Sequence, residues 1–140
     1  MRQTLYRLKK RGFVRVVDRG DELRLQLTPD GKKALKKIKL QNIEIPKPEK
    51  WDGVWRLVAF DIPEQKRKTR FYFRKKLMEM GFVKLEKSLF VHPYPCDTEV
   101  GFLIHVFGIG PYVHRIVATS FNGDRRWEKH FGLSTRCEAA

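Results

Sequence analysis

Hydrophobic and polar residues in the first forty positions follow a helical period, then a strand period, then a helical period again. In residues 2–11, leucines three positions apart stand among basic side chains, which predicts a short amphipathic helix that stops at Gly12. Residues 13–28 alternate apolar with polar types on both sides of a charged turn, which predicts a β-hairpin. Pro29 then suits the first turn of a second helix, whose apolar stripe runs among lysines.

The rest of the chain alternates short apolar runs with amphipathic segments. Residues 55–60 are nearly all apolar, which is typical of a short buried strand. Residues 63–80 and 97–107 carry apolar side chains at helical spacing, and each of these segments is followed by a glycine. Residues 82–94 and 112–121 return to strand-like alternation. The order strand, helix, one or two strands, helix, strand is that of a split βαβ sheet with its helices on one face.

These patterns predict an α+β protein in which a partial winged helix is followed by a ferredoxin-like (split βαβ) domain. Basic helix, hairpin and basic helix are the elements that a winged helix retains when its first two helices are removed. We expect the C-terminal half of a winged-helix DNA-binding domain over residues 1–42 and a proline-punctuated linker over 43–50. The ferredoxin-like domain is expected over 51–121, with a C-terminal tail over 122–140.

Charge narrows the functional classes. The 140 residues contain 30 Lys and Arg against 16 Asp and Glu, a net charge of +14, which favours a polyanionic partner such as nucleic acid. Residues 1–50 hold 15 of the basic and 6 of the acidic side chains, so the front of the chain is its most basic part. No apolar run has the length of a membrane span, and the N-terminus lacks the apolar core of a secretory signal, so we expect a cytoplasmic protein with no membrane partner.

Cysteine and histidine spacing gives little support to a metal site. Cys96 and Cys137 are widely separated and match neither a paired metal-ligand spacing nor a disulfide framework, so both are expected to be reduced. The four histidines are scattered, without the spacing of a zinc motif.

The front of the chain resembles known DNA readers. The stretch Leu5-Tyr6-Arg7-Leu8-Lys9-Lys10-Arg11-Gly12-Phe13-Val14 is similar to the end of a recognition helix and the start of the wing in bacterial winged-helix regulators. The resemblance implies groove contacts from Arg2, Gln3, Thr4 and Arg7, and phosphate contacts from Arg11, Arg19 and Arg24. The second helix would add Lys32, Lys33 and Lys36. The alternative is a solvated basic face that serves only to keep the protein in solution.

A more specific resemblance begins at the predicted buried strand. The residues Trp55-Arg56-Leu57-Val58-Ala59-Phe60-Asp61-Ile62-Pro63-Glu64, then Leu85-Glu86-Lys87-Ser88-Leu89-Phe90-Val91 and Pro93-Tyr94-Pro95-Cys96, resemble the central domain of the PaaX family of transcriptional repressors. The resemblance implies a repressor that binds double-stranded DNA and forms a homodimer through its ferredoxin-like domain. Such repressors respond to coenzyme A thioesters, but nothing in the sequence identifies a small-molecule effector, and no cofactor is expected.

The same resemblance implies a rival function. The family's central domain is similar to a small CRISPR-associated nuclease-like protein that partners the spacer integrase, in which an aspartate at the end of the first strand is proposed to bind a divalent metal. Asp61 stands at that position. The alternative is therefore a metal-dependent endonuclease, in which Asp61 is catalytic and binds Mg²⁺, or a structural partner of an integrase. An aspartate at this point is also a natural helix cap.

Aromatic residues near the basic helix of the second domain have two interpretations. They are Trp51, Trp55, Phe71, Tyr72 and Phe73. Such rings stack on nucleic-acid bases in some proteins, although core packing or a dimer interface is the commoner role for aromatics at these spacings.

Overall fold

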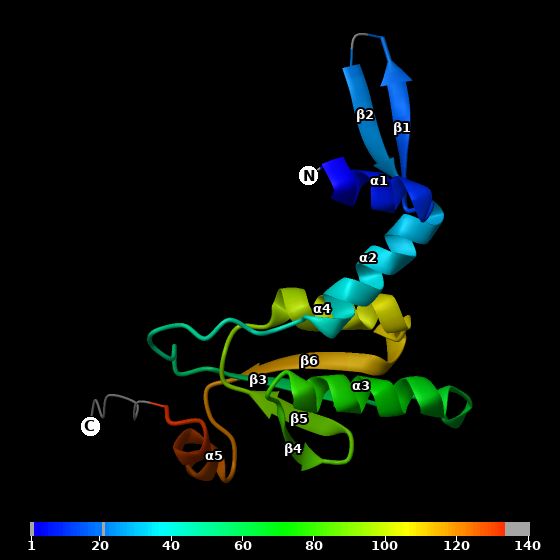
Figure 1. The fold of residues 1–140 in the computed structure, drawn as a ribbon. Helices are drawn as coiled ribbons and strands as arrows, with labels where there is room; N and C mark the ends of the chain where they lie inside the picture. The colour runs from blue at the N-terminus through cyan, green and yellow to red at the C-terminus, as the bar shows by residue number, and fades with distance from the viewer. Residues whose placement is uncertain (1, 21, 134–140) are drawn as a thin grey trace. The chain divides into compact units, whose positions relative to one another are not determined.

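Residues 2–20 and 22–133 are described by the structure, which is a computed structural model (Figure 1). The chain divides into two compact units, the first over Met1–Ile43 and the second over Glu44–Ala140. The fold is mixed α/β with two antiparallel sheets, which is compatible with the α+β class predicted from the sequence. Within the described residues, no helix combines the length and the apolarity needed to cross a membrane.

The first unit is built as helix, hairpin, helix. Its elements are α1 (Arg2–Lys10), β1 (Val14–Arg19), β2 (Glu22–Leu27) and α2 (Pro29–Gln41). The two strands are antiparallel, and their register pairs Val14 with Leu27 and Val16 with Leu25. Because side chains of directly opposed residues share one face of a sheet, these four residues lie together on the apolar face of the hairpin. The predicted helix, hairpin and second helix are confirmed.

The segments of the first unit meet at Thr28. Its hydroxyl donates a hydrogen bond to the carbonyl of Gly12, just after α1, and accepts one from the Gly31 N–H, 3.0 Å away in the first turn of α2. The backbone N–H of Thr28 also donates to the Phe13 carbonyl at 3.0 Å. Thr28 is thus the N-cap of α2 and at the same time fixes the chain leaving α1, which positions both basic helices against one hairpin.

The first unit buries little of its apolar surface. Among its residues whose burial is described, Gly31 is the only buried one. The hairpin residues Val16, Leu25 and Leu27 are exposed, as is Ile38 of α2. The apolar stripes that predicted these elements therefore remain at the surface of this unit.

The second unit contains the remaining elements. They are β3 (Trp55–Phe60), a 3-10 turn (Glu64–Lys66), α3 (Arg67–Glu79), β4 (Val83–Glu86), β5 (Leu89–His92), α4 (Asp97–Phe107), a second 3-10 turn (Gly110–Tyr112), β6 (Val113–Ala118) and α5 (Asp124–His130).

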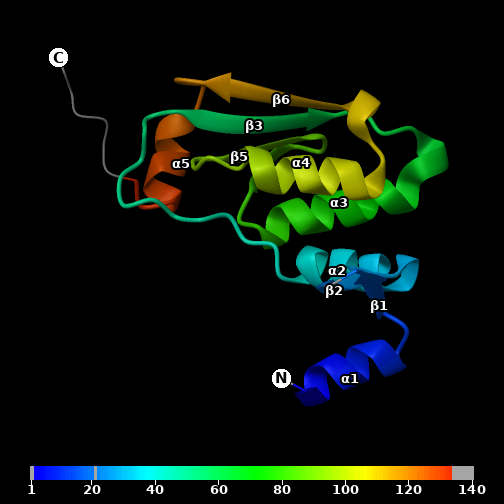
Figure 2. The same cartoon turned by 90° about the horizontal axis from the view of Figure 1, so that it is seen from above.

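Four of these strands form one antiparallel sheet in the order β4-β5-β3-β6. The apolar strand β3 is central and pairs with β5 on one side and β6 on the other. Helices α3 and α4 lie side by side on one face of the sheet (Figure 2). The predicted order of strands and helices, with two strands in residues 82–94, is confirmed, and so are the helices on one face.

The sheet separates two apolar clusters because successive residues of β3 face opposite sides. Phe60 points toward α3, where its ring lies 5.1 Å from that of Phe73 and 5.9 Å from that of Phe90. Trp55 points to the other side, where its ring lies 5.0 Å from that of Trp51 and 5.2 Å from that of Phe121. Residues from α5 also pack on this second cluster, so the short C-terminal helix covers part of the face opposite α3 and α4.

Neither Asp97 nor Asp61 caps a helix, although Asp61 was a natural cap by its position in the sequence. Asp97 is the first residue of α4, whose N-cap is Cys96, and no side chain caps this helix. Asp61 does not cap the helical segment after β3 either, because Pro63 occupies the N-cap of the 3-10 turn without a side-chain hydrogen bond. The extended backbone at Pro63 delays the start of this segment until Glu64, beyond the reach of an aspartate cap at position 61.

Candidate nucleic-acid interface

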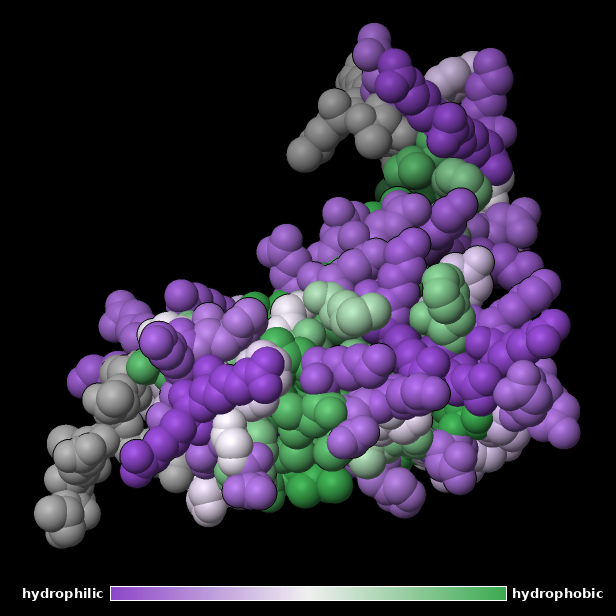
Figure 3. Space-filling view, turned by 90° about the horizontal axis from the view of Figure 1, so that it is seen from below, coloured by the Kyte–Doolittle hydropathy of each residue, from purple (hydrophilic) through white to green (hydrophobic). Residues whose placement is uncertain are grey.

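Hydrophilic residues cover most of the molecular face shown in Figure 3. The first contribution to a basic surface comes from α1. Gln3 and Arg7 are four residues apart in this helix and therefore lie on one face, and both are exposed. Arg11 follows directly after the helix, also exposed, and its N–H donates to the Arg7 carbonyl at 2.9 Å. The helix thus presents polar and cationic groups along one side.

The hairpin supplies a second group of cations. Arg24 of β2 is opposite Val17, and Arg15 of β1 is opposite Gln26. The register places Arg15 and Arg24 on the same face of the hairpin, together with Gln26 and Val17 and opposite to the face of Val14, Val16, Leu25 and Leu27. Arg15 Nε donates to Gln26 Oε1 at 3.1 Å. Arg15 was not among the residues predicted to contact DNA. The alternation in residues 13–28 already indicated that its side chain lies on the face opposite to that of Val14 and Val16.

The third group lies on α2. Lys32, Lys33 and Lys36 are all exposed, and Lys32 and Lys36 share one face because they are four residues apart. Of the predicted DNA-contacting residues, the side chains of Arg2, Thr4 and Arg19 lie outside the described part of the structure. The other predicted residues are at the surface of the first unit, on three adjoining elements of one helix–hairpin–helix arrangement.

Asp61 lies at the end of β3 with an exposed side chain. Its N–H donates to the Tyr112 carbonyl at 2.8 Å, which ties the end of the strand to the start of β6. Within residues 2–20 and 22–133 of one chain, no three His, Cys, Asp or Glu side chains are grouped so that they could hold a metal ion. A divalent cation usually takes several oxygen ligands, and Asp61 supplies one carboxylate from each chain.

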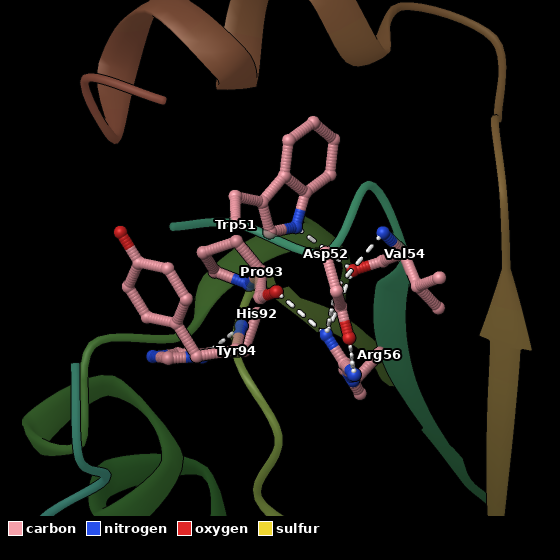
Figure 4. A network of polar contacts seen from close by, with 7 residues as sticks. All are labelled: Trp51, Asp52, Val54, Arg56, His92, Pro93 and Tyr94. Carbon is pink, nitrogen blue, oxygen red and sulfur yellow. Dashed lines mark hydrogen bonds and ion pairs between the residues drawn. The ribbon is translucent and has the colours of Figure 1, made fainter. Parts of the chain in front are cut away.

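A polar network that sequence analysis missed anchors the segment before β3 (Figure 4). The Arg56 guanidinium pairs with both carboxylate oxygens of Asp52 and donates to the Pro93 carbonyl at 2.8 Å. Trp51 Nε1 donates to the Val54 carbonyl at 3.0 Å, which closes the turn over the sheet. Hydrogen bonding to Arg56 holds the pKa of Asp52 below its usual value. The contact between Arg56 and Pro93 joins residues far apart in the sequence, so no local pattern reveals it.

His92 and Cys96 are buried groups beside this network. The Tyr94 N–H donates to His92 Nδ1 at 3.1 Å, and burial lowers the pKa of His92 to about 4. Burial also raises the pKa of the Cys96 thiol to about 12, so the thiolate is essentially absent at neutral pH. Both groups are therefore uncharged at neutral pH, and Cys137 lies outside the described residues.

Comparison with known proteins gives one family match. The sequence model described as "PaaX protein central Cas2-like domain" matches residues 48–129, more than half of the chain and most of the second unit. The comparison with curated proteins finds no match.

Proposed function

Since the chain belongs to the PaaX family by the match of residues 48–129, we propose that it is a DNA-binding transcriptional regulator of the repressor type. The observation that carries this proposal is the first unit, in which α1, the hairpin and α2 all expose cationic side chains. A regulator needs such a surface, because phosphate contacts supply most of the non-specific affinity of DNA-binding proteins.

In this proposal the first unit acts as a partial winged helix on double-stranded DNA. Helix α1 enters a groove and offers Arg2, Gln3, Thr4 and Arg7 to base edges. The β1–β2 hairpin is the wing, and Arg11, Arg19 and Arg24 contact phosphates. Lys32, Lys33 and Lys36 of α2 extend the phosphate contacts. The bond network at Thr28 supports these roles, since it holds both helices and the hairpin in one arrangement.

The second unit is proposed to be a ferredoxin-like domain that forms the homodimer. Its strand order β4-β5-β3-β6, with two helices on one face, is the arrangement expected for a split βαβ sheet. Strand β6 is at the edge of this sheet, and its Ile116 and Val117 are 44% and 68% exposed. An exposed edge strand with apolar side chains is a ready surface for pairing with a second copy.

The test is duplex binding by the full chain over a series of salt concentrations, with a promoter fragment and a scrambled duplex. The variant carries Arg7→Gln, Arg11→Gln and Lys36→Gln. The matched control carries Lys84→Gln, Lys87→Gln and Arg125→Gln, which removes the same charge from exposed positions of the second unit. We expect the first-unit variant to flatten the log–log salt dependence by about 2, since Arg11 and Lys36 are the proposed phosphate contacts among the three and each contributes roughly 0.9.

The comparison of the promoter fragment with the scrambled duplex separates sequence-specific binding from non-specific DNA binding. A regulator prefers the promoter fragment at physiological salt, and that preference is reduced in the first-unit variant. Equal loss of duplex affinity in the variant and the control would contradict the proposal, because binding would then depend on net charge alone.

A further inference from the structure

The positive charge of the second unit is concentrated in one helical segment. Residues 51–140 have 15 basic and 10 acidic side chains, and residues 64–79 alone have 7 and 2 of these. The remainder of residues 51–140 is therefore electrically neutral. Helix α3 and the turn before it thus form a cationic surface separate in sequence from the basic elements of the first unit.

Only part of this charge is used within the protein. Arg70 donates to Glu64 Oε2 at 2.9 Å and to the Ile62 carbonyl at 3.1 Å, while Lys76 lies 3.1 Å from Glu79. Arg74 lies over the Phe60 ring at 5.8 Å. In the part of the chain that the structure describes, Arg67, Lys68 and Lys75 are exposed and make no ion pair. These three side chains are available to an outside anion.

Two aromatic rings lie among these cations. Phe71 is 62% exposed and Tyr72 is 53% exposed, and their ring centroids are 5.6 Å apart. The core positions of α3 are filled by Phe73 and Leu77, which are fully buried, so Phe71 and Tyr72 are not part of the core. Leaving two adjacent aromatic rings in water forfeits the free energy of their burial, which points to a binding role.

Helical spacing arranges these residues in two ridges. Arg67, Phe71 and Lys75 follow one another at intervals of four residues, and Lys68, Tyr72 and Lys76 do the same one position later. Each ridge has the order cation, aromatic ring, cation. Over eight residues a ridge spans roughly 12 Å, since a helix rises about 1.5 Å per residue. This length accommodates more than one nucleotide of an extended strand.

We propose that this face of α3, made of Arg67, Lys68, Phe71, Tyr72 and Lys75, binds single-stranded nucleic acid. The cations contact phosphates, and the two rings stack on unpaired bases. Stacking on exposed aromatic side chains beside cations is the mode by which proteins hold single strands without reading their sequence. A duplex offers its phosphates but not its base faces, so the aromatic rings favour a single strand.

A protein partner is the rival occupant, and the charge argues against it. An interface between proteins is depleted of lysine at its centre, whereas here Lys68 and Lys75 flank the rings directly. The proposal concerns a surface other than the duplex-binding first unit, so each can fail without the other.

The experiment measures binding of the full chain to a short oligo(dT) strand, a strand of unbiased sequence, and a blunt duplex. The aromatic variant carries Phe71→Ala and Tyr72→Ala, and the charge variant carries Arg67→Gln, Lys68→Gln and Lys75→Gln. We expect the aromatic variant to lose about ten-fold or more of its single-strand affinity per ring. The charge variant is expected to flatten the single-strand salt dependence by about 2, since each phosphate contributes roughly 0.7.

Controls separate this surface from the rest of the molecule. The variant with Lys84→Gln, Lys87→Gln and Arg125→Gln removes the same charge and is expected to retain strand affinity within a few-fold of the parent. The aromatic variant is expected to keep its duplex affinity, whereas the first-unit variant loses it and keeps strand binding. Because the replaced side chains are exposed, circular dichroism and melting temperature are expected to be unchanged.

Two results would overturn the proposal. One is equal single-strand affinity in the aromatic variant and the parent chain. The other is a change in oligomeric state of the aromatic variant without a loss of strand binding, which would assign this face to a contact between proteins.

Discussion

The α-carbon of Gly31 lies so near the carbonyl of Phe13 that a β-carbon on residue 31 would be 1.9 Å from the Phe13 oxygen. Carbon and oxygen atoms that are not bonded to each other do not approach this closely. Only glycine therefore fits between the start of α2 and the chain leaving α1. The same carbonyl accepts the hydrogen bond from the Thr28 N–H. The packing of α2 against the chain leaving α1 therefore depends on a close backbone contact as much as on side chains.

Replacing Gly31 with alanine is expected to disorder this junction. In an open helix the change from glycine to alanine stabilises by up to about 1 kcal/mol, but here the β-carbon clashes with backbone. We expect Gly31→Ala to destabilise the first unit and to weaken duplex binding at least ten-fold. Hydrogen exchange of α2 and duplex titration measure the two effects.

The control for this prediction is Gly101→Ala in α4. A β-carbon at residue 101 would meet only the end of the Arg115 side chain, at an ordinary 3.7 Å. This variant is expected to be as stable as the parent chain or more stable. If Gly31→Ala behaved like Gly101→Ala, the close contact with Phe13 would not constrain the fold.

Replacing Arg56 with methionine is expected to lower the stability of the second unit. The Arg56 side chain is 15% exposed and bonds to Asp52 and to the Pro93 carbonyl. Removing it leaves these acceptors without their donor, at a cost of about 1–3 kcal/mol in the free energy of unfolding. Urea unfolding followed by tryptophan emission gives this value. Arg115→Met removes a more exposed arginine and is expected to cost less than about 1 kcal/mol.

His92 is expected to make stability depend on pH. Because burial lowers its pKa from 6.5 to about 4 in the folded state, the unfolded chain binds more protons between these values. The stabilisation is fully present above pH 6.5 and is lost as the pH falls toward 4, by on the order of 3 kcal/mol in total. Urea unfolding at a series of pH values measures this loss.

The variant that tests the role of His92 is His92→Asn. The asparagine side-chain oxygen can still accept a hydrogen bond from the Tyr94 N–H, but the amide does not titrate in this range. This variant is expected to show a smaller pH dependence between 4 and 6.5 than the parent chain. An unchanged slope would assign the pH dependence to other groups. His114→Asn, at an exposed position, is expected to leave the slope as it is.

Introducing a charge on the edge strand β6 is expected to weaken the proposed homodimer. Val117→Lys places an ammonium group at the exposed edge, and burying it against a second copy would be costly. Sedimentation over a range of protein concentrations is expected to show at least a ten-fold rise in the dimer dissociation constant. Thr119→Lys adds the same charge just beyond the strand and serves as the control. Equal association of both variants would place the dimer contact elsewhere.

Asp61→Asn distinguishes the regulator from the metal-dependent endonuclease. A regulator is expected to bind duplex DNA with nearly the parent affinity after this change, and Mg²⁺ is expected to cause no cutting by either protein. Gel analysis of duplex and single-stranded substrates with Mg²⁺ or with a chelator is the measurement. Cutting that requires the metal and disappears in Asp61→Asn would favour the endonuclease, with the missing ligands supplied by a second copy.

Periodicity was sufficient to predict most helices and strands. In the second unit, the apolar run at 55–60 became the central strand, and the stripes in 63–80 and 97–107 became α3 and α4. These features are local, because the period of the apolar residues directly reflects which face of an element is buried. The cap expected from Asp61 was wrong because it depended on the exact first residue of a helix.

The candidate site was less accessible to sequence reasoning. Cationic residues on α1, β2 and α2 could be chosen from their type and position, but their roles stay predictions. The Arg56–Pro93 contact and the close approach of Gly31 to Phe13 were missed, since both depend on how distant segments pack. Helical spacing placed Phe73 in the apolar stripe, but the exposure of Phe71 and Tyr72 could not be read from it, because another element can cover residues outside the stripe.

The aromatic cluster around Trp55 has a practical optical consequence. All three tryptophans, Trp51, Trp55 and Trp127, belong to this one cluster in the second unit. The first unit has a single tyrosine, Tyr6, as its only strong ultraviolet chromophore. Tryptophan emission therefore reports on the second unit alone, and the first unit can unfold or bind with little change in that signal. A fluorophore attached to the first unit would let the two be followed separately and at the same time.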